Sequence, residues 1–422
     1  MPASGSRIPW GVIDPQEGLL RSLRALPRPV WWLFAGSFVN RFGSFVSVFL
    51  VLYLVDRGHS APAAGAVAAA YGVGGLGAAV IGGYVADRLG RRNAIALSMF
   101  SSAVSALALS QVEGLVALWV LTATFGLTSD LYRPASAALL TDLVPSERRL
   151  VAFAGYRLAI NVGFAVGPAV AGFLAERSFV WLFVGEAVTS IVLGVVALVA
   201  LPEGVRTRRR EEARGAGLQA VGQDRSFLIF LVAVVLSGFV YWQSGAAFPL
   251  HVRDSGLSTT VYGLLIGLNA TIIVFLELPL MRFVRRLPAP RVIAVGVLIT
   301  GVGFALTALA HSVLPLAATV VVWTVGEMAA APTSSAYVAE RAPLRLRGRY
   351  QGAYGMTFAL SHILAPAVGT SLYAWSPDGL WLICGAVSVL SAALIVRLPG
   401  GPIRRPHVEP PDVGPEVPGA DR

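Results

Sequence analysis

The stretch AGAVAAAYGVGGLGAAVIGGYVADRLGRR, residues 64–92, combines 23 uncharged residues with a cluster of charges at its end. About 20 consecutive apolar residues in a helix span the ~30 Å hydrocarbon core of a bilayer. Charges that follow such a run directly mark the place where the chain leaves the lipid. Residues 64–86 are therefore predicted to form a membrane-spanning helix.

The same pattern recurs along the whole chain. Its 422 residues are 55% hydrophobic and 13% charged, about half the charged share of a soluble domain. We predict twelve spans, because the apolar runs lie at residues 30–54, 64–86, 93–111, 115–140, 151–175, 179–201, 226–250, 259–281, 291–310, 314–338, 350–374 and 379–398. Bare loops and sheet edges cannot sit in lipid, so every span is expected to be a helix. The prediction is an all-α membrane protein, which excludes a soluble enzyme.

The basic residues set the expected orientation. All 33 are arginine, and 27 lie in the termini or in the loops after the second, fourth, sixth, eighth and tenth spans. Positive charge collects on the cytoplasmic side, so both termini are predicted to be cytoplasmic in a multi-pass protein of the cell membrane. The net charge of +10 could suggest nucleic acid. Because the arginines alternate with apolar runs, the expected partner is the lipid bilayer and not a nucleic acid.

The arginine-rich segment 202–225 divides the chain into two halves of six spans each. We expect a cytoplasmic segment at 1–29, a six-helix bundle at 30–201, a cytoplasmic basic linker at 202–225, a second bundle at 226–398 and a disordered cytoplasmic tail at 399–422. The single cysteine, Cys384, lies in the last apolar run. A disulfide framework and a cysteine-based metal site are therefore not expected.

The two halves repeat each other. A shift of 198 residues aligns 134–174 with 332–372 without a gap and gives ten identities in 41 positions, including Pro134, Pro145 and Pro168 with Pro332, Pro343 and Pro366. Repeated six-helix units are the build of secondary transporters, which bind substrate between the halves near the membrane midplane.

The charged end of the opening stretch, GYVADRLGRR, resembles the signature GxxxDRxGRR of the major facilitator superfamily. The resemblance implies two pseudo-symmetric six-helix bundles and a gate on the cytoplasmic side. Gly90 would permit a tight turn, and an acid with three arginines could hold one of two rigid-body states. The residues of this expected gate are Gly83, Asp87, Arg88, Gly90, Arg91 and Arg92, with Asp142 as a charge partner.

The fifth span contains a glycine and proline pattern that resembles the antiporter motif of drug–proton exchangers in this family. Its members are Gly163, Gly167, Pro168 and Gly172, with Ala171 where glycine is usual. The glycines permit close backbone approach, and simple helix packing is the alternative interpretation. The resemblance as a whole points to the twelve-span bacterial multidrug branch, although Thr122 stands where exporters often have an arginine.

Charged residues inside membrane spans are costly and call for a functional explanation. The first, fourth, seventh and tenth spans, which line the cavity in this superfamily, carry polar stripes here. The candidates for proton coupling or the substrate cavity are Glu327, Asp130, Arg41, Arg133, Asn40, Tyr241, Trp242 and Trp323. A carboxylate shielded from water can exchange a proton near neutral pH. We expect Glu327 to carry the proton or meet a cationic substrate, and Asp130 to form a structural or switching ion pair with Arg133 and Arg41. The aromatic candidates could equally lie at the membrane interface, and Glu186 and Glu277 are weaker acidic candidates.

These observations predict a proton-coupled exporter of small hydrophobic or cationic compounds that works by alternating access. We expect a monomer driven by the proton gradient, with no metal or other cofactor. The nearest alternative is a uniporter or symporter for a nutrient or metabolite on the same fold. An intramembrane enzyme or a sensor is a remote alternative, because the sequence lacks motifs such as HExxH and GxSxG.

Overall fold

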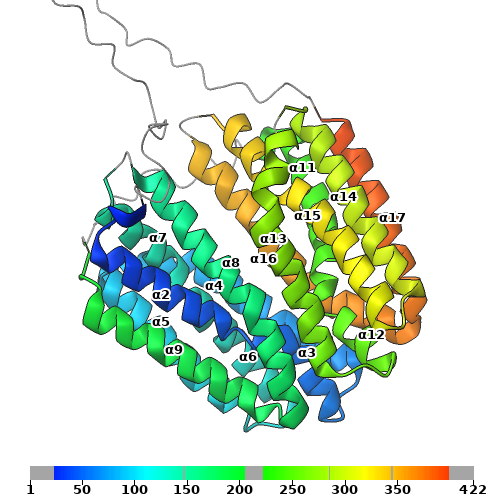
Figure 1. The fold of residues 1–422 in the computed structure, drawn as a ribbon, viewed down its shortest axis with the longest axis horizontal. Coiled ribbons are helices and arrows are strands. Elements are labelled where there is room, and N and C mark those ends of the chain that lie inside the picture. Colours follow the sequence, from blue (N-terminus) through cyan, green and yellow to red (C-terminus); the bar gives the residue numbers. More distant parts are fainter. Residues whose placement is uncertain (1–22, 146–147, 205–221, 285, 344–345, 399–422) are drawn as a thin grey trace, which may run out of the picture.

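The computed structural model describes residues 23–145, 148–204, 222–284, 286–343 and 346–398. In these ranges every regular element is a helix (Figure 1). Most of the predicted N-terminal segment and linker and all of the predicted C-terminal tail lie outside the described residues, as does the residue pair 146–147 that follows Pro145.

Twelve helical segments are long and apolar enough to cross a membrane, which confirms the predicted all-α, twelve-span fold. The helices are α2 (Arg28–Phe42), α3 (Val46–Asp56), α4 (Ala61–Leu89), α5 (Arg91–Leu109), α6 (Leu115–Asp130), α7 (Tyr132–Leu143), α8 (Arg149–Arg177), α9 (Val180–Ala200), α11 (Arg225–Tyr241), α12 (Phe248–Asp254), α13 (Thr259–Val284), α14 (Ala289–Leu306), α15 (Val313–Arg341), α16 (Arg347–Trp375) and α17 (Pro377–Val396). Two single 3₁₀ turns, η2 (Trp242–Ser244) and η3 (Thr307–Leu309), complete the set.

Three of the twelve spans consist of two helices each. The first is α2 with α3, the fourth is α6 with α7, and the seventh is α11 with η2 and α12. In the first span the break falls at Gly43, where the side chain of Thr189 fills the space that a Cβ would need. The backbone N–H groups freed by such a break need new partners in lipid, so each break needs support from a neighbouring helix.

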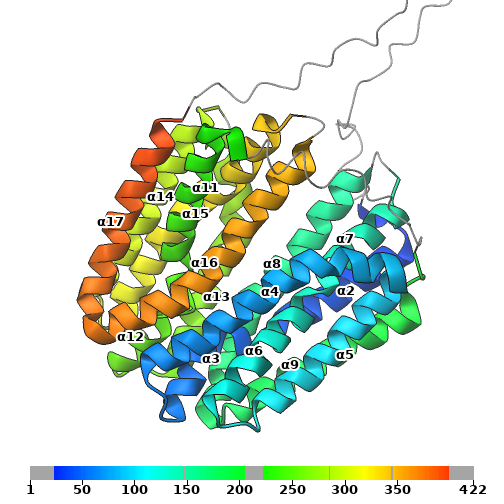
Figure 2. The same ribbon diagram turned by 180° about the vertical axis from the view of Figure 1, so that it is seen from behind.

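The helices form two bundles. Helices α2 to α9 pack mainly on one another, as do α11 to α17, and the bundles meet along α8 with α13 and along α4 with α16. Figures 1 and 2 show the bundles side by side from opposite directions, with α2 beginning and α17 ending at the same end of the molecule. We call this the terminal end and the opposite one the far end.

The bundles are joined most closely in their far halves. Gly172 of α8 lies against the backbone of Thr259 and Thr260, and Gly263 of α13 lies against the carbonyl of Pro168. Gly65 of α4 packs in the same way on Pro366 of α16. Small residues let helix backbones approach each other, which explains why these two seams are tight.

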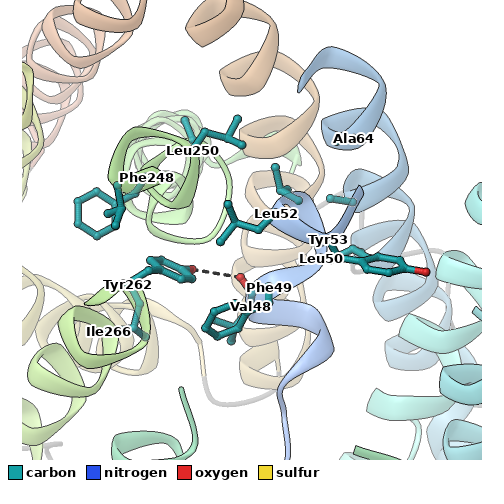
Figure 3. Close-up of a cluster of buried hydrophobic side chains, with 14 of the residues drawn as sticks. Val48, Phe49, Leu50, Leu52, Tyr53, Ala64, Phe248, Leu250, Tyr262 and Ile266 are labelled. Carbon is teal, nitrogen blue, oxygen red and sulfur yellow. Dashed lines mark hydrogen bonds between the residues drawn. The ribbon is translucent and has the colours of Figure 1, made fainter. Parts of the chain in front are cut away.

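A cluster of buried apolar side chains closes the far end between the bundles. Figure 3 shows Phe49 and Leu52 of α3 facing Phe248 of α12 and Tyr262 of α13. The Phe49 and Tyr262 rings meet edge to face with centroids 5.0 Å apart. The Tyr262 hydroxyl lies 3.1 Å from the Val48 carbonyl oxygen and 3.1 Å from that of Ser244, so it bridges the two bundles. Figure 2 shows the bundle ribbons diverging from here toward the terminal end.

Candidate transport site

A cavity of about 350 Å³ lies between the two bundles, within the size range of small-molecule sites. Its wall in the first bundle comes from α2, α7 and α8, and its wall in the second comes from α11, α13 and α15. The lining residues are Arg41, Tyr132, Arg133, Tyr156, Ile160, Asn161, Phe164, Tyr241, Asn269, Ala270, Ile273 and Glu327.

Glu327 is the acid on the wall of the second bundle. Its Oε2 accepts a hydrogen bond of 2.9 Å from the Asn269 side-chain amide, and the same amide lies 2.9 Å from the Thr324 hydroxyl. The Tyr241 hydroxyl also hydrogen-bonds this carboxylate. These partners are neutral, so they orient Glu327 without compensating its charge.

The wall of the first bundle carries an ionic group with different chemistry. Asp130, the last residue of α6, lies 2.9 Å from Arg133 and 3.9 Å from Arg41 between their nearest charged atoms. The sequence expectation had named these three residues as one ion-pair group, and the structure brings them together. Oδ1 of Asp130 nevertheless accepts no hydrogen bond among the described residues, so the arginine N–H groups are not aligned on it.

A second cavity of about 320 Å³ lies inside the second bundle, and we call it the annex. It shares Tyr241 and Glu327 with the central cavity, so these two side chains stand at the boundary between the two spaces. The remaining lining residues are mostly apolar or hydroxyl-bearing: Val234, Ser237, Gly238, Trp242, Ile293, Val297, Thr300, Ala330, Ala331, Ser334, Tyr354, Phe358, Ser361 and Ser388.

Four predicted cavity residues do not line the cavity between the bundles: Asp130, which pairs with two lining arginines, and Trp323, Asn40 and Trp242. Trp323 is 1% exposed and stacks on Phe304 in the core of the second bundle, because its side chain faces α14. Asn40 faces the interior of the first bundle, where its amide lies 3.4 Å from the sulfur of Met99. Trp242 lines the annex instead of the central cavity and stacks on His362 with ring centroids 4.1 Å apart.

The two weaker acidic candidates have structural partners. Glu186 is buried in α9, and its Oε2 accepts a 2.7 Å hydrogen bond from the backbone N–H of Val46, the first residue of α3. It therefore supports the break in the first span. Glu277 of α13 lies 3.5 Å from Arg157 of α8, so this ion pair joins the two bundles on the terminal side of the cavity.

The expected gate residues cluster at the terminal end of the first bundle. Gly90 has φ of +87°, which glycine adopts without strain, and it forms the turn between α4 and α5. Arg91 lies 3.3 Å from Asp87 and 3.2 Å from Asp142, while Arg92 lies 2.7 Å from Glu203. These ion pairs tie α4, α5, α7 and the segment after α9 together.

The other two gate residues lie at the edge of this cluster. The Arg88 guanidinium donates to the Tyr84 hydroxyl at 2.8 Å. A Cβ at Gly83 would meet open space, so this glycine makes no close helix contact among the described residues.

The glycine and proline pattern places α8 between two partners. Gly163 and Gly167 face the last turn of α2, around Phe38 and Phe42, within the first bundle. Pro168 and Gly172 face α13 of the second bundle, as described above. One helix thus carries the backbone contacts both within its own bundle and across the seam.

Sequence reasoning missed several residues of the site and one ionic cluster. Asn269, Tyr156 and Asn161 were missed because α13 and α8 were not expected to line the cavity, although a lone amide in an apolar span is a usable signal. Tyr132 was missed although it lies in the fourth span, which was expected to line the cavity. At the terminal end, Arg341 lies 2.7 Å from Asp224, which also caps α11 by accepting from the Phe227 N–H at 3.0 Å. Burial tends to raise the Asp224 pKa, but hydrogen bonds from Arg341, Phe227 and Tyr350 outweigh it and lower the pKa below its ordinary value.

The described residues contain no group of three or more His, Cys, Asp or Glu side chains arranged to hold a metal ion. The chemistry of the site is therefore that of Glu327, the arginines and their hydrogen-bonding neighbours.

The sequence matches the family model described as Major Facilitator Superfamily over residues 33–276 and 230–418. Among curated proteins it is 28% identical over 348 residues to the uncharacterized MFS-type transporter YqjV of Bacillus subtilis, covering 80% of this chain and 85% of that one. It is 24% identical to a Na(+), Li(+), K(+)/H(+) antiporter of Planococcus maritimus, covering 75% and 82%. It is 26% identical to the multidrug resistance protein MdtH of Aeromonas salmonicida, covering 87% and 94%.

Solved structures with the same fold include other transporters. A mutant of the peptide transporter POT in complex with sulfate superposes with a TM-score of 0.74 at 17% identity, covering 90% of this chain and 97% of that one. A mutant of the nucleoside transporter NupG gives a TM-score of 0.75 at 17% identity, covering 88% and 99%. At this identity the likeness establishes the fold alone.

Proposed function

This chain belongs to the Major Facilitator Superfamily, and from that premise we propose that it exports small hydrophobic or cationic compounds in exchange for protons. The chain is a multi-pass membrane transporter, and its fold provides the two bundles that alternating access requires. The proposal concerns the transported compound, the direction of transport and the driving ion. It takes the proton gradient as the energy source and a monomer as the functional unit.

The observation that carries the proposal is the position of Glu327. Its carboxylate lines both the central cavity and the annex, and it is held by Asn269 and Tyr241, which are neutral. A carboxylate in such a setting can lose or gain a proton without breaking an ion pair. Proton release can therefore accompany binding of a cationic group, and proton uptake can accompany its departure.

The closed far end and the arginine distribution support loading of the cavity from the cytoplasm, as export requires. The apolar cluster around Tyr262 closes the path on one side, and the terminal end carries most of the arginines. If arginine-rich loops face the cytoplasm, the central cavity in this conformation is reached from the cytoplasm in a protein of the cell membrane. The Arg157–Glu277 pair and the cluster around Arg91 are then gate contacts on the cytoplasmic side.

The names of two relatives support efflux by exchange. MdtH is named as a multidrug resistance protein, and the Planococcus maritimus relative is named as an antiporter that exchanges alkali cations for protons. The annex supports organic cargo, because its walls are mostly apolar and it is large enough for a ring system.

Proteoliposomes with an imposed proton gradient test the proposal. Internal pH is recorded while lipophilic cations and neutral antibiotics are added to wild type, Glu327→Gln and Asp130→Asn. Compound-triggered proton movement that is lost in Glu327→Gln supports both the exchange and the site. Proton movement that survives Glu327→Gln and is lost in Asp130→Asn indicates that Asp130, not Glu327, carries the proton.

The same experiment separates the alternative functions. Compound-driven proton movement in the opposite direction indicates a symporter, and compound uptake without proton movement indicates a uniporter. A response to Na⁺ or K⁺ alone indicates that the cargo is an alkali cation.

A further inference from the structure

The wall of the first bundle holds more positive charge than its own acid balances. Arg41 and Arg133 both line the central cavity, and Asp130 is the acid paired with them. Two cations and one anion leave one positive charge in excess. The side chain of Arg41 is 16% exposed, that of Arg133 is 52% exposed and that of Asp130 is 19% exposed. The excess positive charge therefore lies in a partly dehydrated space, where an unbalanced charge is costly.

Hydrogen-bond donors on this wall also lack partners. The buried Nε of Arg41 and the hydroxyl of Tyr132, whose residue is 0% exposed, have no hydrogen-bond partner among the described residues. Both residues line the cavity. A buried polar group without a hydrogen-bond partner is destabilising, so native structures normally supply a partner. A guanidinium N–H and a phenol O–H on one wall form a donor set for an anionic oxygen.

The opposite wall has the complementary character. Glu327 is the charged residue that the second bundle contributes to the cavity lining, and its neutral partners leave its negative charge to meet a cation. The cavity therefore presents an anion-binding wall from one bundle and a cation-binding wall from the other. A ligand carrying both charges would contact both bundles at once.

We propose that the preferred substrate is a zwitterion whose acidic group binds Arg41, Arg133 and Tyr132 and whose basic nitrogen binds Glu327. The neighbouring annex takes an apolar part of the same molecule. This inference rests on the proposed function, because it specifies the cargo of the same cavity. It narrows that cargo from cations in general to compounds that also carry an anionic oxygen group.

The test uses three probes built on one scaffold: 4-(piperazin-1-yl)benzoic acid, its methyl ester and its N-acetyl derivative. The first carries both charges, the second carries the cation alone and the third carries the anion alone. Binding is measured by equilibrium dialysis with the full chain in lipid nanodiscs, which needs no proton gradient. Wild type is expected to bind the zwitterion at least about tenfold more tightly than either derivative.

Arginine variants identify the anion-binding wall. Arg41→Gln and Arg133→Gln are each expected to weaken the zwitterion and the N-acetyl probe about tenfold, and to leave the methyl ester within about threefold. Arg57→Gln is the matched control, because Arg57 pairs with Glu113 and Tyr53 beyond the end of α3, away from the cavity. Arg133 is half exposed, so its variant provides the answer if Arg41→Gln does not fold.

Several results overturn the proposal. They are equal binding of the ester and the zwitterion by wild type, no binding of any probe by folded protein, and unchanged probe preference in both arginine variants. The proposed exchange is tested separately by proton movement in liposomes. Zwitterion binding without proton movement contradicts the proposed proton exchange but supports the proposed substrate class. Proton movement with no preference for the zwitterion supports the exchange but contradicts the substrate class.

Discussion

Glu327 lines the central cavity, Asp130 pairs with two arginines that line the opposite wall, and the partners of the two acids differ in kind. Asp130 lies among cations, with Arg133 at 2.9 Å and Arg41 at 3.9 Å. Glu327 lies among neutral donors, with the Asn269 amide at 2.9 Å and the Tyr241 hydroxyl also bonded to it. Neutralising an acid held by cations would leave the cations uncompensated. An acid held by neutral donors can change its charge at lower cost.

The comparison bears on two roles that the sequence already distinguished. Both acids lie in polar stripes of membrane spans, at positions that the 198-residue repeat makes nearly equivalent, but Asp130 has Arg133 three residues later in its own span. Their partners support the proposed structural role for Asp130 and the proposed proton exchange at Glu327. The comparison therefore predicts opposite results for neutral substitutions at the two positions.

The largest effect is expected for Glu327→Gln. Glutamine keeps the shape and an oxygen acceptor for Asn269, so the protein should fold with nearly wild-type stability. It cannot exchange a proton, so compound-triggered proton movement should fall by at least about a hundredfold, a range typical for removal of an essential proton-transfer group. The measurement is internal pH in proteoliposomes, with thermal unfolding of the same preparation as the folding control. Full activity of this variant would remove the distinction between the two acids.

Asp130→Asn should show the reverse pattern. Removal of this carboxylate leaves Arg41 and Arg133 adjacent and unbalanced, and the unfolding free energy should fall by about 2 kcal/mol. Thermal unfolding in one detergent checks the size of the loss. Adding Arg133→Gln to this variant should restore part of the stability, because it removes the half-exposed excess charge. An unchanged unfolding temperature in Asp130→Asn would contradict the structural role.

Glu186 sharpens the comparison, because its hydrogen-bond donor is a neutral backbone N–H group and it does not line either described cavity. Its carboxylate accepts from the Val46 N–H at the start of α3, so Glu186→Gln weakens a charge-assisted bond to a helix N-terminus. We expect a loss of about 1 kcal/mol in unfolding free energy and retained proton movement. Glu186→Ala should cost more, since it leaves the backbone group without an acceptor. If Glu186→Gln also loses proton movement, an acid with a neutral hydrogen-bond donor can take part in proton coupling without lining a cavity.

The fold was largely predictable from the sequence, because each membrane span corresponds to a long continuous run of apolar residues. Twelve apolar runs predicted twelve spans, and the helix bounds agree with them to within a few residues at most ends. The breaks inside the first, fourth and seventh spans were not predicted. Gly43 is a local signal for the first break. Pro134 is one for the break at Leu131, because it has no N–H to donate to the Asp130 carbonyl four residues earlier. The support from Glu186, 140 residues from Val46, is a property of helix packing alone.

The site was predictable in part, for the same physical reason. Charges in apolar spans identified Glu327, Asp130, Arg41 and Arg133, since each stands out within its own helix. Partners from other helices do not stand out in this way. Asn269 and Tyr132 join the site only because α13 and α7 pack against the cavity, and Trp323 leaves it because its side chain points toward α14.

The smallest effect is expected for Asp224→Asn. Asp224 pairs with Arg341 at the terminal end, so this variant tests whether an acid paired with a cation stabilises the fold through its charge there as well. Its hydrogen bonds from Arg341, Phe227 and Tyr350 hold its pKa below the unfolded value of about 3.9, although burial acts in the opposite direction. A lowered pKa stabilises the folded state above the unfolded pKa, and that contribution is lost as the pH falls through the folded pKa. Asparagine can still cap α11, so Asp224→Asn should cost only about 1 kcal/mol at pH 7. Unfolding temperatures of the two proteins measured from pH 8 downward should converge below pH about 3, because wild-type Asp224 is then neutral as well. A difference that stays constant with pH would mean that the carboxylate acts through shape and not through its charge, and the pairing rule drawn from Asp130 would not extend to this residue.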